Sequence, residues 1–420
     1  MKRIVILGYG GRGAIYAKLC KNMKKDFEIV AVIDNSKERL DGAKRTLALN
    51  DDQLFLSLDD FLKEPKIADW IFICTREKDH REHAIKSLRN GYNILLEKPV
   101  ACSIQDCLEI EKVAKETNLE VAVCHVLRYS PYYDKIKEVI DSGVLGNIIS
   151  IDQVENVAFW HQAHSFVRGD NRKLEGGTPL IIAKCCHDLD IAVYLANSKC
   201  KQVSSQGKLN YFKFENAPQG ATEYCLDGCK AKENCPYDAE KIYIDPIKHL
   251  PKSTIRNMWP QTRLMADGIV TIPKLYDALK TTNFGRCVFM MDNDVVDHQV
   301  TNMVFENGIF STLTMSAFSG PCYRETRVRG TLGELVCNMG ENKIVLYPFG
   351  KRKKNIRLNS KLDAHGGGDK LLIESLANDN LRTDISQSVE GHIIGFAAEE
   401  SRLNNGMPIN LDEIRKKYAN

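Results

Sequence analysis

A glycine-rich segment near the N-terminus is the first part of the chain whose residue types and spacing could do chemistry. Gly8, Gly10 and Gly13 form a G-x-G-x-x-G motif that also contains Gly11 and Arg12. The motif follows an apolar run that predicts a strand and opens a segment with helical spacing. Glycines at these places permit a tight turn, close approach of the backbone to a pyrophosphate and close helix-strand packing. We therefore expect these five residues to bind a dinucleotide.

An acidic residue follows at the spacing that such a site requires. Asp34 ends the second predicted strand, about twenty residues after the last glycine, where a carboxylate would accept hydrogen bonds from a ribose hydroxyl. Its charge would repel a 2′-phosphate, so the sequence favours NAD over NADP, although Arg12 and Lys37 could soften this preference. The alternative is a glycine turn and a helix-capping aspartate without a cofactor.

Glu97-Lys98-Pro99 directly follows the fourth apolar strand, residues 92–96. The carboxyl ends of parallel strands are where open α/β sheets bind ligands. Lys98 is therefore a candidate active-site residue. The alternative is a surface lysine in a strand-to-helix loop.

A second cluster of reactive side chains lies in Lys184-Cys185-Cys186-His187-Asp188-Leu189-Asp190. In one helix, Lys184 and His187 would share a face, as would His187 and Asp190. A histidine beside a carboxylate suits proton removal from a hydroxyl group. We predict that His187 and Lys184 are catalytic; the alternative for His187 is a core histidine.

Two further segments carry side chains that suit a polyhydroxylated ligand. Trp160, His161, His164 and Arg168 combine aromatic faces with polar donors. The segment His365-Gly366-Gly367-Gly368-Asp369 is either a turn that brings a histidine to the site or a plain loop. The expected substrate contacts are Lys98, Trp160, His164, Arg168, Lys184, His187, Asp188 and His365.

The cysteines Cys225, Cys229 and Cys235 have ligand-like spacing. Three thiolates could hold a structural zinc ion with a fourth ligand from elsewhere, but the paired C-x2-C pattern is missing. The alternative is three reduced cysteines.

Alternating strands and helices organise the first part of the chain. Apolar runs at residues 3–7, 29–33, 70–73, 92–96 and 119–124 alternate with segments of helical spacing. This pattern predicts an α/β domain, residues 1–124, with a doubly wound parallel sheet of the Rossmann type.

After residue 124 the pattern changes. A predicted helix at residues 131–142 leads to strands at 148–154, 297–305, 309–315 and 334–338, with hairpin turns between them. We expect a second α+β domain, residues 125–420, with a large, mostly antiparallel open sheet. Residues 206–285 lack clear periodicity and predict an insertion or lid.

Composition excludes several classes of protein. The 420 residues carry 58 Lys and Arg against 55 Asp and Glu, so the net charge is only +3. This balance argues against a nucleic-acid or membrane-surface partner, and no window has the roughly eighteen apolar residues of a membrane-spanning helix. The first apolar run is too short for a signal peptide, so we expect a cytoplasmic protein with mostly reduced cysteines.

Several motifs, in order along the chain, together resemble the glucose-fructose oxidoreductase, inositol dehydrogenase and rhizopine-catabolism (Gfo/Idh/MocA) family. They are the glycine fingerprint, Glu97-Lys98-Pro99, residues 75–80, Arg128-Tyr129-Ser130-Pro131 and Gly143-Val144-Leu145-Gly146. The resemblance implies that Lys98 contacts both the nicotinamide ribose and the reacting hydroxyl. It also adds Thr75, His80, Glu97 and Arg128 to the expected cofactor contacts, and it implies a homodimer or homotetramer formed through the second sheet.

His187 aligns with the catalytic histidine of that family, but one neighbour departs from the usual pattern. The family commonly has an aspartate four residues earlier, where this chain has Ala183. Lys184, Asp188 or Asp190 would then tune His187, and the reaction can differ from simple alcohol oxidation. The His365 segment resembles a motif of the family's sugar-processing branches, which include NAD-dependent glycoside hydrolases.

These observations predict an NAD-dependent oxidoreductase that acts on a secondary hydroxyl of a sugar, glycoside or cyclitol. The first alternative is a glycoside-cleaving enzyme that oxidises its substrate only transiently. The second is a non-catalytic NAD-binding sensor.

Overall fold

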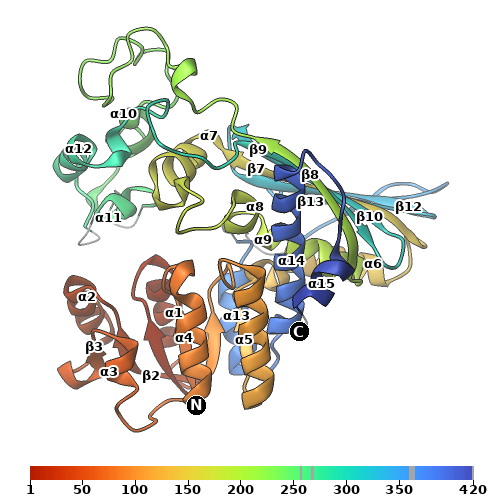
Figure 1. Ribbon diagram of the computed structural model, residues 1–420, viewed down its shortest axis with the longest axis horizontal. Coiled ribbons are helices and arrows are strands. Elements are labelled where there is room, and N and C mark those ends of the chain that lie inside the picture. The colour runs from red at the N-terminus through yellow and green to blue at the C-terminus, as the bar shows by residue number, and fades with distance from the viewer. Residues whose placement is uncertain (256–257, 266–268, 359–364, 419–420) are drawn as a thin grey trace.

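The computed structural model describes residues 1–255, 258–265, 269–358 and 365–418. Figure 1 shows two sheets with helices between and around them, and a group of short helices that projects beyond the second sheet. None of the helices in these ranges is long and apolar enough to cross a membrane.

The first sheet has six parallel strands in the order β3-β2-β1-β4-β5-β6. This order confirms the predicted Rossmann sheet. Its strands are β1 Lys2–Leu7, β2 Phe27–Ile33, β3 Leu54–Phe55, β4 Trp70–Ile73, β5 Asn93–Leu96 and β6 Val121–Val123. Its helices are α1 Gly11–Asn22, α2 Lys37–Leu47, α3 Leu58–Phe61, α4 Glu77–Arg89 and α5 Ile104–Thr117.

The second sheet has nine strands in the order β14-β13-β12-β11-β7-β10-β9-β8-β15. The β7–β10 pair is parallel, and the other strand pairs recorded for this sheet are antiparallel. The predicted large, mostly antiparallel sheet is therefore confirmed. The strands are β7 Ile148–Ala158, β8 Cys200–Lys208, β9 His298–Phe305, β10 Phe310–Ser319, β11 Tyr323–Gly330, β12 Gly333–Asn338, β13 Lys343–Pro348, β14 Lys354–Ile356 and β15 Ile409–Asn410.

Helices cover one face of the second sheet and connect it to the first. The helices α9 Cys186–Ala196 and α14 Ile385–Leu403 pack against its strands. The helix α13 Gly368–Ala377, in contrast, lies on the Rossmann half, where Leu372 and Ile373 share a buried cluster with Ile4. The C-terminal part of the chain therefore completes the core of the first half, which the predicted boundary at residue 125 did not anticipate.

The predicted helix around His187 is broken in the structure. The helix α8 Leu180–Ala183 ends at Lys184, and α9 begins at Cys186. Lys184 and His187 thus belong to different helices, and the expectation that they share one helical face is wrong.

The segment between β8 and β9 forms the projecting group at the upper left of Figure 1. It contains the short helices α10 Ala239–Tyr243, α11 Lys252–Ile255 and α12 Ile272–Thr281. It has a hydrophobic cluster of its own, which includes Phe212, Tyr243, Leu275 and Val288. This segment corresponds to the predicted insertion, except that β8 continues to Lys208.

Candidate active site

The glycine loop leaves space where a dinucleotide would approach. Gly8 has a φ of +92°, and a Cβ atom there would lie 2.8 Å from the main chain of Cys74. A Cβ at Gly13 would lie 2.0 Å from the carbonyl oxygen of Gly8. At Gly10 and Gly11, in contrast, an added Cβ meets no atom of the described chain within 4 Å. The loop is closed toward the sheet and open at the N-terminus of α1, so it fits a pyrophosphate.

Asp34 lies at the end of β2, where a ribose would be recognised. Its Oδ2 accepts a hydrogen bond from the backbone N–H of Tyr9 at 2.7 Å, and its Oδ1 accepts one from the N–H of Ser36 at 2.9 Å. The guanidinium of Arg39 is 3.7 Å away. A carboxylate can accept further hydrogen bonds beyond these, so the residue can hold the loop and also bind a ribose hydroxyl.

Arg12 joins the glycine loop to two carboxylates. Its Nε donates to Oε1 of Glu97 at 2.6 Å, and its Nη2 donates to Oδ1 of Asp369, in α13, at 2.5 Å. Burial favours a higher pKa for both acids, but the charge and hydrogen bonds of Arg12 outweigh it, helped at Asp369 by His365, and both pKa values lie below the ordinary range. The expected cofactor contacts Arg12 and Glu97 are thus engaged with each other.

Lys98 follows Glu97 at the carboxyl end of β5 and reaches into the second half of the molecule. Its Nζ donates to the main-chain carbonyl oxygen of Ala183 at 2.9 Å. His80 contacts the backbone at two residues. Its Nδ1 lies 2.8 Å from the carbonyl oxygen of Pro99, and its Nε2 lies 3.2 Å from that of Thr75. His80 therefore contacts the backbone that carries Lys98.

His187 lies beside Lys98 and within a group of histidines. Its side chain is buried, and its Nδ1 has no hydrogen-bond partner among the described residues. Burial first, and then the charge of Lys98, hold the pKa of His187 well below its ordinary value. Its ring centroid is 5.8 Å from that of His125 and 5.9 Å from that of His365. A neutral, buried imidazole can accept a proton.

The residues expected to tune His187 have other partners. Lys184 lies 2.8 Å from Glu155, and Asp188 accepts hydrogen bonds from Arg324 at 2.7 and 3.2 Å. Asp190 accepts a bidentate pair from Arg128 at 2.7 and 2.8 Å. The expectation that Lys184, Asp188 or Asp190 takes the place of the missing aspartate beside His187 is therefore not supported by these contacts. Arg128, expected at the cofactor, is buried in its pair with Asp190.

Aromatic rings extend from this cluster toward the insertion. The ring centroid of Trp160 is 5.8 Å from His161 and 5.4 Å from Trp259, which belongs to the insertion. Burial first, and then the charges of Lys184 and Lys98, lower the pKa of His161. The expected contact of Trp160 with a substrate stays a prediction.

Two other expected substrate contacts lie deeper. His164 is buried, with Nδ1 at 3.0 Å from the hydroxyl of Tyr243 and its ring stacked on Phe284. Arg168 is also buried, and its guanidinium donates to the carbonyl oxygens of Arg286 at 2.7 Å and Tyr237 at 2.8 Å. The structure does not bring Arg168 to the Lys98 and His187 cluster.

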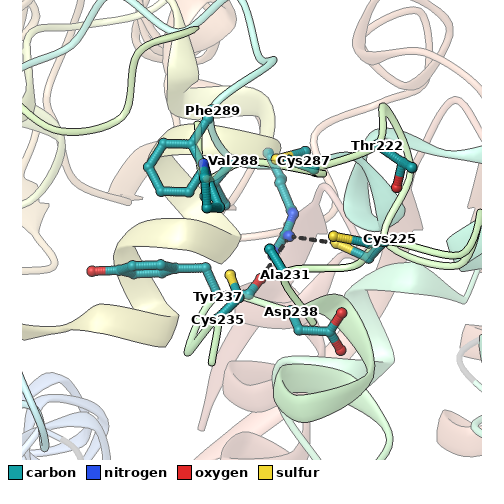
Figure 2. A pocket seen from close by; sticks show the side chains of 13 residues that line it. Thr222, Cys225, Ala231, Cys235, Tyr237, Asp238, Cys287, Val288 and Phe289 are labelled. Carbon is teal, nitrogen blue, oxygen red and sulfur yellow. Dashed lines mark hydrogen bonds between the residues drawn. The ribbon is translucent and has the colours of Figure 1, made fainter. Parts of the chain in front are cut away.

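The cysteines of the insertion line one small pocket, shown in Figure 2. Cys225, Cys229 and Cys235 are joined there by Cys287, and Nη2 of Arg168 donates to Sγ of Cys225 at 3.6 Å. Across the described ranges, no three His, Cys, Asp or Glu side chains are grouped so that they could hold a metal ion. The predicted structural zinc site is therefore not supported. The thiols line one pocket, but they are not arranged as metal ligands, and the guanidinium of Arg168 lies beside Cys225.

Three residues of this region, His125, Glu155 and Arg324, were not predicted from the sequence. His125 follows β6, and its position at the carboxyl end of a parallel strand is a signal that could have revealed it. Glu155 and Arg324 face each other across β7 and β11, with Nη2 of Arg324 at 2.9 Å from Oε2 of Glu155. Their pairing depends on sheet register, and nothing local in the sequence signals it.

Comparisons with known proteins agree with this architecture. YteT of Bacillus subtilis (strain 168), which is named as an oxidoreductase, is 26% identical and aligns over 99% of both chains. The scyllo-inositol 2-dehydrogenase (NAD(+)) of the same organism is 24% identical over 74% of this chain and 93% of its own. The crystal structure of scyllo-inositol dehydrogenase from Lactobacillus casei with bound NAD(H) and scyllo-inositol superposes with a TM-score of 0.65, at 17% identity, over 98% of this chain and 99% of that one.

Family models match both halves of the molecule. Residues 2–125 match the oxidoreductase family model for an NAD-binding Rossmann fold, and residues 137–358 match the C-terminal alpha/beta domain of the same family. The six-stranded parallel sheet lies within the first of these ranges, and most strands of the second sheet lie within the other. The chain therefore belongs to the Gfo/Idh/MocA oxidoreductase family and carries its NAD-binding Rossmann domain.

Proposed function

We propose that the protein is an NAD-dependent dehydrogenase that oxidises a secondary hydroxyl group of a sugar, glycoside or cyclitol. One observation carries the proposal. At the carboxyl edge of the Rossmann sheet, Lys98 donates a hydrogen bond to the carbonyl oxygen of Ala183, and its charge acts on His187. The relationship to a scyllo-inositol 2-dehydrogenase supports this substrate class.

Each side chain has a role that follows from its surroundings. The glycine loop and Asp34 would hold NAD, which when bound supplies the acceptor for a hydride. Lys98, whose ammonium group already donates to a carbonyl oxygen, would donate to the hydroxyl oxygen of the substrate and stabilise negative charge there. His187, held neutral by burial, would accept the hydroxyl proton.

The charged and aromatic surroundings would set specificity. Lys184, fixed by Glu155, and Asp188, fixed by Arg324, present a rigid set of hydrogen-bonding groups. Trp160 would offer an aromatic face to the apolar side of a sugar ring. His365, whose ring centroid is 5.9 Å from that of His187, would contact the substrate beside it.

The test is NADH formation from NAD with a panel of sugars, cyclitols and nitrophenyl glycosides. We expect sustained NADH formation with at least one polyol, and a loss of roughly 10²-fold or more in Lys98→Met. Lys63→Ala is the matched control, because Lys63 is an exposed lysine of the Rossmann half that pairs with Asp60. NAD binding without turnover of any substrate would contradict the proposal and favour a sensor.

A second candidate is cleavage of a glycoside through transient oxidation of a neighbouring hydroxyl. The observation that favours it is a second acid–base group: His365 pairs with Asp369 and lies close to His187. Such cleavage needs one group to remove a C–H proton and another to protonate the departing oxygen. Nitrophenol release without NADH accumulation in the same panel would select this reaction.

We also propose that the uncovered face of the second sheet joins two copies of the chain. Val300 in β9 and Phe310 and Phe318 in β10 are large apolar side chains exposed by 41%, 59% and 47%. These exposed side chains lie along the adjacent strands β9 and β10, and extended exposed apolar surface marks an interface. Light scattering should give a mass of at least twice 47.4 kDa, and Phe310→Glu should reduce it to that of one chain.

A further inference from the structure

The buried position of His187 creates a problem that the proposed reaction must solve. The side chain is nearly inaccessible to water, so a proton that it accepts needs a second group to carry it away. Two histidines flank it. His125 is fully buried, and so is His392, whose ring centroid lies 5.7 Å from that of His125. His365, in contrast, has a side chain that is 32% exposed.

We propose that His365 is the proton outlet of this site: it takes the proton from His187 and releases it to water, and Asp369 and Arg12 position it for this step. The inference rests on the proposed function, because it concerns the proton of the substrate hydroxyl. Neither Asp369 nor Arg12 needs to touch the substrate, so both are positioning residues.

The contact between His365 and Asp369 sets the direction of transfer. Nδ1 of His365 lies 2.9 Å from Oδ2 of Asp369. In a neutral ring, donation of Nδ1–H to the carboxylate makes Nε2 the basic nitrogen, which can accept a proton. The same carboxylate stabilises the imidazolium that results. Asp369 remains ionised because Arg12 and His365 hold its pKa below the ordinary range against the effect of burial.

Two of the three glycines of this loop pack too closely on neighbouring atoms to carry a side chain. Gly366 has a φ of +64°, and a Cβ there would lie 2.3 Å from Oγ of Ser130. A Cβ at Gly368 would lie 1.9 Å from the carbonyl oxygen of Val126. Oγ of Ser130 also donates to the carbonyl oxygen of Gly366 at 3.0 Å. The loop therefore packs closely on the segment after β6, which holds His365 near His187.

The step balances without any further reactant. The O–H bond of the substrate breaks and its proton forms an N–H bond on His187. That bond breaks as His365 accepts the proton, and water or buffer finally takes it. The two electrons of the C–H bond leave as hydride to NAD, which the family's cofactor domain supplies.

The first test is chemical rescue. We expect His365→Ala to lower kcat at least tenfold and added imidazole to restore it in a concentration-dependent way, because a free imidazole can occupy the vacated position. Asp369→Asn should lower kcat less. His298→Ala is the matched control: His298 also pairs with an aspartate, Asp297, at 2.7 Å and is 40% exposed, but it lies in β9. It should keep kcat and show no response to imidazole.

The second test separates proton release from oxidation. In a single turnover with a pH indicator, wild-type protein should release its proton together with NADH formation. In His365→Ala the proton should lag behind NADH, and the affinity for NAD, measured by protein fluorescence, should not change. His365→Gln provides a second variant if the alanine variant unfolds.

The outcomes are distinct. Full kcat in both His365 variants contradicts the proposal that His365 is the proton outlet. So does a loss of kcat that imidazole does not restore, if the proton is still released together with NADH formation. A wild-type protein that oxidises no hydroxyl in the panel overturns the proposed function itself, and with it this inference.

Discussion

The ammonium group of Lys98 donates a hydrogen bond to the main-chain carbonyl oxygen of Ala183 at 2.9 Å. This contact joins the Rossmann half to the second half at position 183, where the family resemblance leads us to expect an aspartate. A backbone oxygen therefore holds Lys98, and no carboxylate at position 183 offsets the positive charge near His187. The positive charge of Lys98 therefore adds to the effect of burial, which is the larger cause of the lowered pKa of His187.

The first prediction concerns the pH dependence of oxidation. Burial and Lys98 lower the pKa of His187 well below 6.5, so the imidazole is already neutral at pH 6.5 and above. We expect the acid limb of kcat/KM to lie below pH 6.5. Ala183→Asp should move that limb to higher pH, because a carboxylate favours the imidazolium, whereas Ala183→Asn should leave it in place. If the acid limb of kcat/KM lies at the same pH in the two variants, the result contradicts this explanation.

The second prediction concerns cofactor choice. Asp34 presents a carboxylate where a 2′-phosphate would lie, and Arg39 is 3.7 Å from it. Asp34→Ser removes the repulsion and leaves Arg39 to pair with the phosphate. We expect the ratio of Kd for NADP to Kd for NAD to fall by roughly tenfold or more, measured by fluorescence titration. Arg39→Ala in the same background should reverse much of the gain; an unchanged ratio would argue against Asp34 as the selector.

The third prediction concerns the ion pairs that Arg12 forms with Glu97 and Asp369. Glu97 is buried, so Arg12→Met leaves an uncompensated carboxylate in the interior, at a cost of about 3 kcal/mol. Arg3→Met is the control, because Arg3 and Glu28 form an exposed pair 3.5 Å apart worth less than about 1 kcal/mol. Urea unfolding should separate the two variants clearly. Adding Glu97→Gln to Arg12→Met should recover part of the loss, and failure to do so would show that the charge of Glu97 is not the cause.

The sequence was most informative where structure is local. Strands of a parallel sheet covered on both faces are continuous apolar runs, such as Trp70–Ile73, and this is why the Rossmann half could be predicted. Strands such as β8 Cys200–Lys208 carry only partly apolar patterns and were missed. The break at Lys184 has no Gly or Pro at the residue itself to signal it.

The candidate site shows the same limit. Gly8, Asp34 and Lys98 could be identified because each lies at a strand end, a position visible in the sequence. The partners of Lys184 and Asp188 could not, because Glu155 and Arg324 meet them only through the register of distant strands. Sequence alone therefore indicated the candidate reacting groups better than the charged side chains that surround them.

The fourth prediction concerns stability in acid. Burial lowers the pKa of His125, His164 and His392 to about 3 in the folded protein. Between pH 6.5 and 3 the unfolded chain therefore binds more protons at these residues than the folded one. Stability falls as pH falls through this window, by up to about 1.4 kcal/mol per pH unit for each histidine.

The melting temperature measured between pH 7 and pH 5 checks this directly for one of them. His164→Phe keeps a ring to stack on Phe284, whose centroid is 5.0 Å away, and removes the titrating group. Its melting temperature should therefore fall less steeply with acid than that of the wild type. His298→Asn alters a partly exposed histidine and should follow the wild-type slope. If His164→Phe and the wild type lose stability in parallel, the neutral burial of His164 is not what makes the fold sensitive to acid.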